Sequence, residues 1–201
     1  MHITGSHLKL ILLLLVFGSP VFGQQTVDLS KVNAAYEGSF FKVNIGIAPG
    51  TFKDLLNDDS YQIAPLHFDI GGGKRLNKTF APYINLHGNV LIKSTQYFSA
   101  FSEAGLGAGL NIYSKRANTY IAPEASFSVL AYEENGGNDF SRGNMGANLT
   151  VRSGWDFHIG GHVFAGAEAM LSYFFAKNSE DEYLKWNGFL YGANLYLKFG
   201  K

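Results

Sequence analysis

The sequence predicts an all-β fold, an eight-stranded antiparallel up-and-down transmembrane β-barrel that follows an N-terminal signal peptide. Three observations indicate it. Eight segments alternate apolar residues with Gly, polar or charged ones, the connections between them alternate between short and long, and aromatic residues gather near the segment ends. A period of two is typical of strands whose two faces meet different solvents.

The N-terminal segment, residues 1–23, predicts a cleavable signal peptide. The apolar run Leu10–Phe17 follows a basic residue, and small residues precede a cleavage expected after Gly23. We then expect a periplasmic stub over 24–35 and the barrel over 36–201. Because a transmembrane helix needs roughly 20 apolar residues, this run is too short to be one, and membrane residence must come from strands.

Composition excludes several classes of protein. Lys+Arg and Asp+Glu are 16 each, so no basic stripe for nucleic acid is expected. The chain has no Cys, which excludes disulfides, Cys-based metal sites and a lipoprotein anchor. Charged residues make up 16%, aromatics 15%, and Gly numbers 24, a balance that favours curved sheets with aromatic rims. We expect no cofactor.

The strands are expected near residues 36–48, 62–75, 80–93, 99–113, 118–132, 143–158, 162–175 and 187–199. The connections after the second, fourth and sixth are short: Asn77–Lys78, Ser114–Ala117 and Ile159–Gly161. Most others are long and polar: Pro49–Tyr61, Glu133–Arg142 and Ala176–Lys185. This asymmetry predicts tight periplasmic turns, extracellular loops and both barrel termini in the periplasm.

Aromatic residues near the strand ends predict two girdles at the headgroup levels of a membrane. The turn-side girdle is expected to contain Phe40, Phe41, Phe80, Tyr83, Tyr113, Tyr120, Trp155, Phe157 and Phe199. The loop-side girdle is expected to contain Tyr97, Phe98, Tyr132, Tyr173, Phe175, Trp186 and Phe189.

Alternation alone also fits a soluble lipocalin-like binding barrel, which has eight strands and an apolar interior. The polar face favours the opposite arrangement, because it carries glycines beside charged residues, as at Gly105, Gly107 and Glu103. Gly weakens a water-exposed sheet, whereas a narrow barrel interior needs small residues and paired charges. We therefore expect the polar face to point inward.

An interior charge network is predicted on that face. A hairpin turning about Gly160 would set Arg152 opposite Glu168 and His158 opposite His162. The other expected members are Glu103, Glu124, Lys42 and Lys198. Two roles remain open, structural neutralisation or a gate that switches ion pairs.

The interior histidines fit two chemical alternatives, a metal site and an enzyme. A hairpin about Asn77 would set His67 opposite His87, with Asp69 nearby, the donor types of a transition-metal site. A lipid A-modifying enzyme would need His with Ser and a carboxylate. Interior histidines also serve as hydrogen-bonding spacers, so no metal is expected. The residues after the histidines do not make the His-x-Ser-Asn signature of the outer-membrane deacylases, so no enzyme is expected.

Several local patterns together resemble one family. They are the Ile121–Glu124 strand start, the Gly154–Phe157 strand end with its Gly160–Gly161 turn, and the Gly-rich last strand. The chain resembles the outer-membrane-protein β-barrel (porin-like) family, which is similar to the OmpX and OmpA transmembrane barrels. The resemblance implies an integral outer-membrane monomer whose partners are outer-membrane lipid, the barrel-assembly machinery and any extracellular partner of its loops. Because eight strands leave an interior filled by side chains, we expect a structural or interaction role rather than a general porin.

Overall fold

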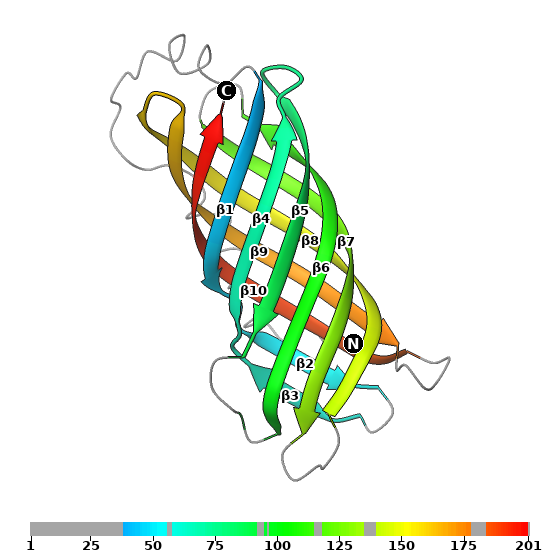
Figure 1. Cartoon of the computed structure of the whole chain (residues 1–201). Helices are drawn as coiled ribbons and strands as arrows, with labels where there is room; N and C mark the ends of the chain where they lie inside the picture. The colour runs from blue at the N-terminus through cyan, green and yellow to red at the C-terminus, as the bar shows by residue number, and fades with distance from the viewer. Residues whose placement is uncertain are drawn as a thin grey trace, which may run out of the picture.

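The computed structural model describes residues 38–55, 58–91, 95, 97–114, 118–134, 140–177 and 184–200. They form a tall barrel of tilted strands (Figure 1). Its strands are β1 (Ser39–Ile47), β2 (Gly50–Asp54), β3 (Ser60–Ile63), β4 (Leu66–Lys74), β5 (Phe80–Val90), β6 (Phe98–Tyr113), β7 (Thr119–Glu134), β8 (Phe140–Gly160), β9 (Val163–Lys177) and β10 (Leu184–Gly200). The predicted signal peptide and periplasmic stub lie outside the described residues.

Each strand pairs antiparallel with its neighbours, and the pairing of β1 with β10 closes the sheet on itself. The short turns gather at one end, here called the turn end, and β2 and β3 lie at the other, the loop end (Figure 1). In the part of the chain that is described, no helix is long and apolar enough to cross a membrane. The predicted fold class, an antiparallel barrel of eight strands, is confirmed.

Ten strands make an eight-stranded barrel because two proline positions divide two long strands. β2 continues β1 alongside β10 in unchanged register, and β3 leads into β4 in the same way. Pro49 and Pro65 mark the breaks, since proline has no amide hydrogen to donate to the ladder. Across them the Ala48 amide donates to the Pro65 carbonyl at 3.0 Å. The expected loop Pro49–Tyr61 is therefore wrong for most of its length, which is strand.

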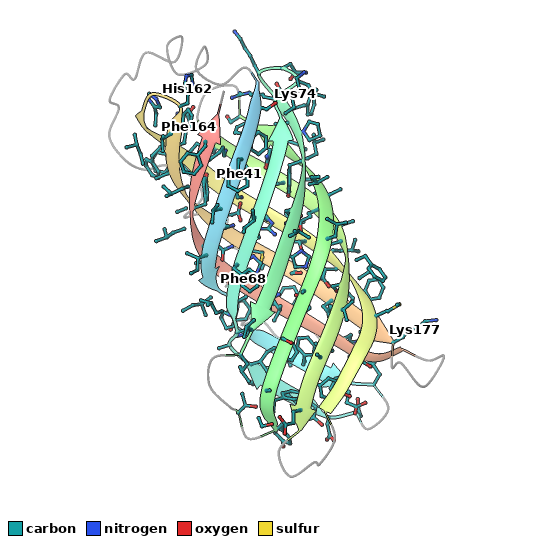
Figure 2. All side chains as sticks on the ribbon, viewed as in Figure 1. Phe41, Phe68, Lys74, His162, Phe164 and Lys177 are labelled. Atoms are coloured by element: carbon teal, nitrogen blue, oxygen red, sulfur yellow. The ribbon has the colours of Figure 1, made fainter. Side chains whose placement is uncertain are left out.

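The apolar face of the barrel points outward and the polar face inward. Ile84 and Leu195 are 64% and 68% exposed, whereas Arg152 is 2% exposed. Figure 2 shows the outward side chains around the wall. This is the arrangement of a barrel surrounded by lipid, and it is the reverse of the lipocalin-like alternative.

The predicted girdles need correction. Trp155, Phe157, Phe199, Tyr173 and Phe189 are exposed, and Phe175 is partly exposed. Trp186 is only 1% exposed and lies inside the barrel, because even-numbered residues of β10 face inward. The same correction applies to several other expected girdle members, which are buried: Phe40, Tyr113, Tyr120, Phe98 and Tyr132.

The interior glycines make room for rings from the neighbouring strand. Tyr196 lies directly opposite Gly166, and a Cβ on that glycine would stand 2.0 Å from the Tyr196 ring. Tyr83 opposite Gly109 and Tyr120 opposite Gly154 repeat the arrangement at 2.5 Å. A large ring on one strand thus takes the space that a side chain on the next would occupy, which lets a narrow barrel close.

Candidate functional site in the barrel interior

Arg152 is the centre of the interior charge network. It lies on β8 and is surrounded by carboxylates from three other strands. Its Nη1 lies 3.0 Å from Glu168 Oε1 and also contacts Asp69, while its Nε lies 3.0 Å from Glu124 Oε2. All four side chains are buried. One guanidinium with several donors can satisfy several carboxylates at once, as burial of these charges requires.

The pairing of strands differs from the predicted register by two residues. Arg152 pairs with Met170 and Glu168 with Gly154, so the salt bridge is diagonal rather than directly cross-strand. The expected pair His158 and His162 is likewise wrong, since His158 pairs with Phe164. The cause is the position of the turn, which lies at Gly161 and His162 rather than around Gly160. A bulge between His158 and Gly160 then reduces the offset by one residue.

Glu168 links Arg152 to the β1 side of the barrel. Lys42 Nζ donates to Glu168 Oε2 at 2.6 Å, and Tyr120 donates its hydroxyl to the same oxygen at 2.6 Å. Asn44 Nδ2 donates to Glu168 Oε1 at 2.9 Å. Both carboxylate oxygens therefore carry several donors, which compensates for the loss of water.

Glu103 belongs to a second group of side chains, nearer the loop end. It accepts from Asn89 Nδ2 at 2.7 Å and from Asn148 Nδ2 at 3.0 Å, and its Oε1 lies 3.0 Å from His87 Nε2. His87 Nδ1 in turn lies 4.0 Å from Glu124 Oε1. The two groups are thus adjacent, with His87 between them.

Lys198 forms a third group at the turn end. Its ammonium donates to both oxygens of Asp156, at 2.6 and 2.7 Å, and to the Tyr113 hydroxyl at 2.9 Å. It also lies 5.2 to 5.6 Å from the ring centroids of Phe40, Tyr113, Tyr120 and Tyr196. Tyr120, whose ring lies beside Lys198, donates its hydroxyl to Glu168, so this third group adjoins the group around Arg152.

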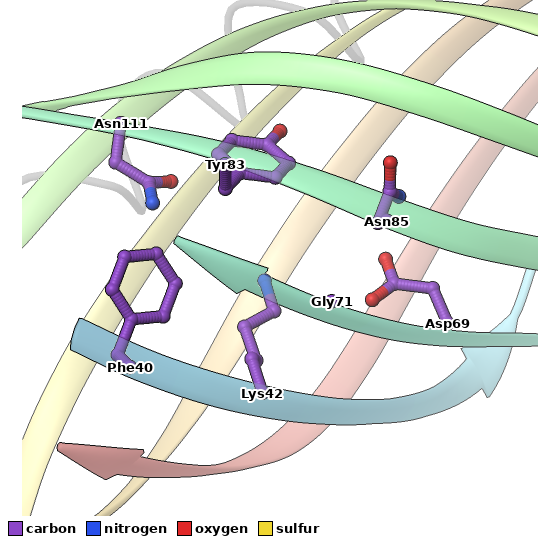
Figure 3. A pocket seen from close by; sticks show the side chains of 7 residues that line it. All are labelled: Phe40, Lys42, Asp69, Gly71, Tyr83, Asn85 and Asn111. Atoms are coloured by element: carbon purple, nitrogen blue, oxygen red, sulfur yellow. The ribbon is translucent and has the colours of Figure 1, made fainter. Parts of the chain in front are cut away.

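A small cavity opens beside Lys42 (Figure 3). Its volume of about 10 Å³ is what a single water molecule needs. The lining residues come from β1, β4, β5 and β6: Phe40, Lys42, Asp69, Gly71, Tyr83, Asn85 and Asn111. The cavity is too small for an organic substrate.

The metal candidates do not converge. His67 pairs with Asn89, and His87 pairs with Asp69, so the expected opposition of the two imidazoles is wrong. His67 Nδ1 lies 3.0 Å from Asn89 Oδ1, and its Nε2 lies 3.9 Å from Asp69 Oδ2. Across the described ranges, no three His, Asp or Glu side chains are grouped to hold a metal ion.

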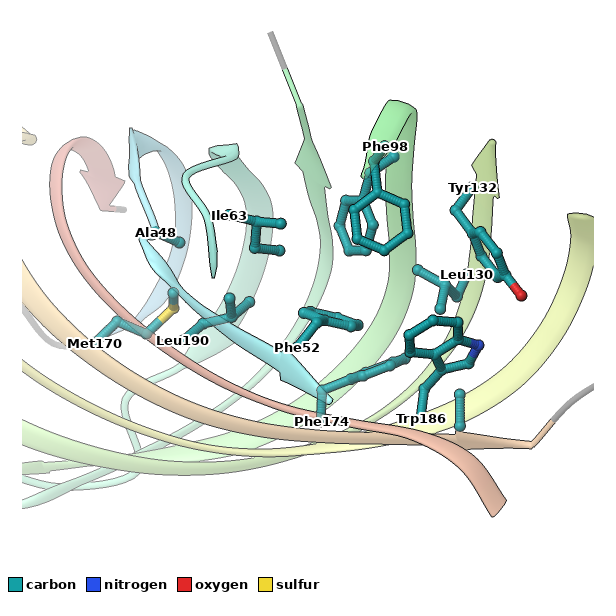
Figure 4. Close-up of a cluster of buried hydrophobic side chains, with 12 residues drawn as sticks. Ala48, Phe52, Ile63, Phe98, Leu130, Tyr132, Met170, Phe174, Trp186 and Leu190 are labelled. Carbon is teal, nitrogen blue, oxygen red and sulfur yellow. The ribbon is translucent and has the colours of Figure 1, made fainter. Parts of the chain in front are cut away.

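Apolar side chains occupy the interior at the loop end (Figure 4), a group called here the loop-end cluster. Phe52 and Phe101 have ring centroids 4.9 Å apart, and Tyr132 and Trp186 have centroids 5.1 Å apart. The remaining buried members are Ala48, Ile63, Phe98, Leu130, Met170, Phe174, Ala176 and Leu190. A register shift between Phe98 and Ala100 lets both Phe98 and Phe101 face inward.

Sequence reasoning missed several residues that the interior groups depend on. Asp156 partners Lys198, and Asp69 contacts Arg152, although Asp69 had been considered only as a metal ligand. Tyr83 donates its hydroxyl to Glu124 Oε2 at 2.9 Å. Asp156 was detectable, because it shares the inward face of its strand with Arg152. Tyr83 was not, because aromatic residues near strand ends fit a girdle equally well.

Comparison with solved structures shows similar barrels. Neisserial surface protein A (NspA) matches with a TM-score of 0.54 and 14% identity, over 80% of this chain and 97% of that chain. Ail of Yersinia pestis matches at 0.45 and 15%, over 80% and 99%. The outer membrane protein OprG of Pseudomonas aeruginosa matches at 0.42 and 7%, over 83% and 98%.

No protein-family model matches the chain. No curated protein matches it either. Of the three structures above, NspA alone exceeds a TM-score of 0.5, and at 14% identity the likeness is one of fold. The chain therefore has the fold of the eight-stranded outer-membrane barrels, as its resemblance to the OmpX and OmpA barrels predicts.

Proposed function

We propose that the protein is an integral outer-membrane barrel with a filled interior, which serves a structural or interaction role and is neither a general porin nor an enzyme. The observation that carries the proposal is the order in which three layers of side chains fill the interior from one end to the other. The Lys198 and Asp156 pair lies among rings at the turn end, the Arg152 network follows, and the loop-end cluster lies beyond it. Such an interior leaves no path for hydrophilic solutes.

The charge network is proposed to be structural. Glu168 also pairs with Lys42 on β1, and Glu124 also accepts from Tyr83 on β5, so the network holds opposite sides of the wall together. The turn end, with the outer ends of β1 and β10, is proposed to face the periplasm. The connections at the loop end would then face outward and offer the surface for an extracellular partner.

Vesicle permeability tests the proposal. Vesicles containing the folded protein are expected to swell in an isotonic sugar no faster than empty vesicles, while a general porin incorporated at the same density makes them swell at once. Sugar-dependent swelling by this protein would contradict the filled interior. Empty vesicles and vesicles with the general porin are the negative and positive controls.

A further inference from the structure

The two ends of the barrel carry different surface charge. At the turn end the surface residues Lys74, Arg75, Lys78, His158 and His162 gather, and none of the acidic residues described at that end is exposed. The loop end carries both signs, in Lys53, Asp58, Asp59, Glu133 and Lys177. Figure 2 shows Lys74 and His162 at one end and Lys177 at the other. The turn end is thus a basic rim, defined by its five residues.

Lys74 stands on the outer face of the wall, at the edge of the apolar belt. It follows Ile70 and Gly72 on the outward face of β4. Gly72 pairs with Phe41 on one side and Ile84 on the other, and these are 46% and 64% exposed. Between two large apolar side chains, Gly72 itself puts no side chain on the outer surface. Lys74 therefore follows, on the same outward face, an apolar strip with space at its centre.

The neighbouring turn is held in place by Arg75. Its guanidinium lies 4.5 Å from the Tyr113 ring centroid and donates to the carbonyls of Asn77 at 3.1 Å and Lys78 at 2.7 Å. Lys78 is exposed on this turn. Within the described part of the chain, no carboxylate forms an ion pair with Lys74 or Lys78. Two ammonium groups are thus available to an anion.

We propose that this rim binds the headgroup of an anionic phospholipid, of the phosphatidylglycerol type, with an acyl chain lying over Gly72 between Phe41 and Ile84. The inference rests on the proposed function, because it needs a bilayer around the barrel. Cations at headgroup level attract anionic lipid, and a lysine stem can lie on apolar surface while its ammonium meets the phosphate. A cell-wall polymer is less suited, since Lys74 faces the lipid side of the wall.

Quenching of tryptophan fluorescence by brominated lipid tests this locally. A Trp155→Phe, Phe41→Trp chain places a reporter beside Gly72, while Trp186 stays buried at the other end. Brominated phosphatidylglycerol in phosphatidylcholine vesicles is expected to quench it more than brominated phosphatidylcholine at the same fraction. Lys74→Gln is expected to lower the relative binding constant about fivefold, the effect of one lysine at an anionic surface. Lys177→Gln, the matched change at the loop end, should leave it unchanged.

The outcomes separate the two proposals. A chain that does not fold in any vesicle would overturn the proposed function and this inference with it. A folded barrel quenched equally by both brominated lipids would overturn this inference alone. Equal quenching together with peptidoglycan cosedimentation that Lys74→Gln abolishes would assign the rim to the cell wall instead. Preferential quenching that is lost in Lys74→Gln and kept in Lys177→Gln supports the inference.

Discussion

Arg152 on β8 and Glu168 on β9 form a buried salt bridge of 3.0 Å although they are two residues away from direct pairing. The diagonal contact leaves the guanidinium free to reach Asp69 and Glu124 across the interior as well. A directly opposed pair would neutralise charges on two strands only. This geometry therefore makes Arg152 the residue on which most of the interior charge depends.

Replacing Arg152 by Gln is expected to lower the free energy of unfolding by about 3 to 5 kcal/mol, because it leaves buried carboxylates without their cation. Urea unfolding of the vesicle-inserted barrel measures the change. Lys53→Gln is the control, since it breaks an ion pair with Asp58 at an exposed site, where solvent screening leaves little effect on stability. Equal losses in the two variants would contradict the central role of Arg152.

Gly166→Ala is expected to destabilise the barrel by about 1 to 3 kcal/mol, because the new methyl group overlaps the Tyr196 ring and must displace it. The Tyr196 hydroxyl donates to Asp156, so the displacement also disturbs the partner of Lys198. Gly160→Ala is the matched change, with nothing within 4 Å of its Cβ. The midpoint of urea unfolding should fall for the first variant and hold for the second.

Trp186→Ala is expected to cost about 3 to 5 kcal/mol, since it leaves a cavity in the loop-end cluster that the surrounding rings cannot refill. Phe189 lies on the same strand and is 43% exposed. Phe189→Ala leaves no interior cavity and should cost less. If both variants unfolded at the same urea concentration, the loop-end cluster would not be a packed core.

The two tryptophans are expected to respond oppositely to brominated lipid. Trp155 is 36% exposed on the outer wall, and Trp186 is 1% exposed inside. A Trp186→Phe chain should therefore be quenched, and a Trp155→Phe chain should keep most of its fluorescence. Quenching of the second chain as strong as that of the first would place Trp186 on the lipid side, as the girdle prediction had it.

The alternation of residue types was enough to predict the barrel, its eight strands and the direction of its faces. Parity along β10 also placed Trp186 inside, together with Gly188 and Asn194. The girdle prediction overrode that parity, because an aromatic residue near a strand end satisfies both a membrane interface and an interior cluster.

The sequence could not predict the register between strands or the continuation of the first two strands as β2 and β3. One residue of slippage at the turn after β8 shifts every facing pair by two positions along the neighbouring strand, and no local pattern marks it. Pro49 is predicted to end the first strand, since proline removes a ladder hydrogen bond, whereas the second strand is predicted to begin at residue 62 and to include Pro65. In the structure the two prolines interrupt neighbouring strands at the same level, where the Ala48 amide donates to the Pro65 carbonyl. The ladder therefore resumes beyond them as the pairing of β2 with β3.

Gel mobility of residues 24–201, boiled and unboiled, after refolding with and without lipid vesicles, tests the central claim most directly. The account predicts a fast-migrating unboiled band that forms only with lipid and resists protease across its strands, because the outward face is apolar. A compact, protease-resistant form that appears in buffer without lipid would contradict it. That result would require the apolar residues Leu106, Leu149 and Leu171 to face inward.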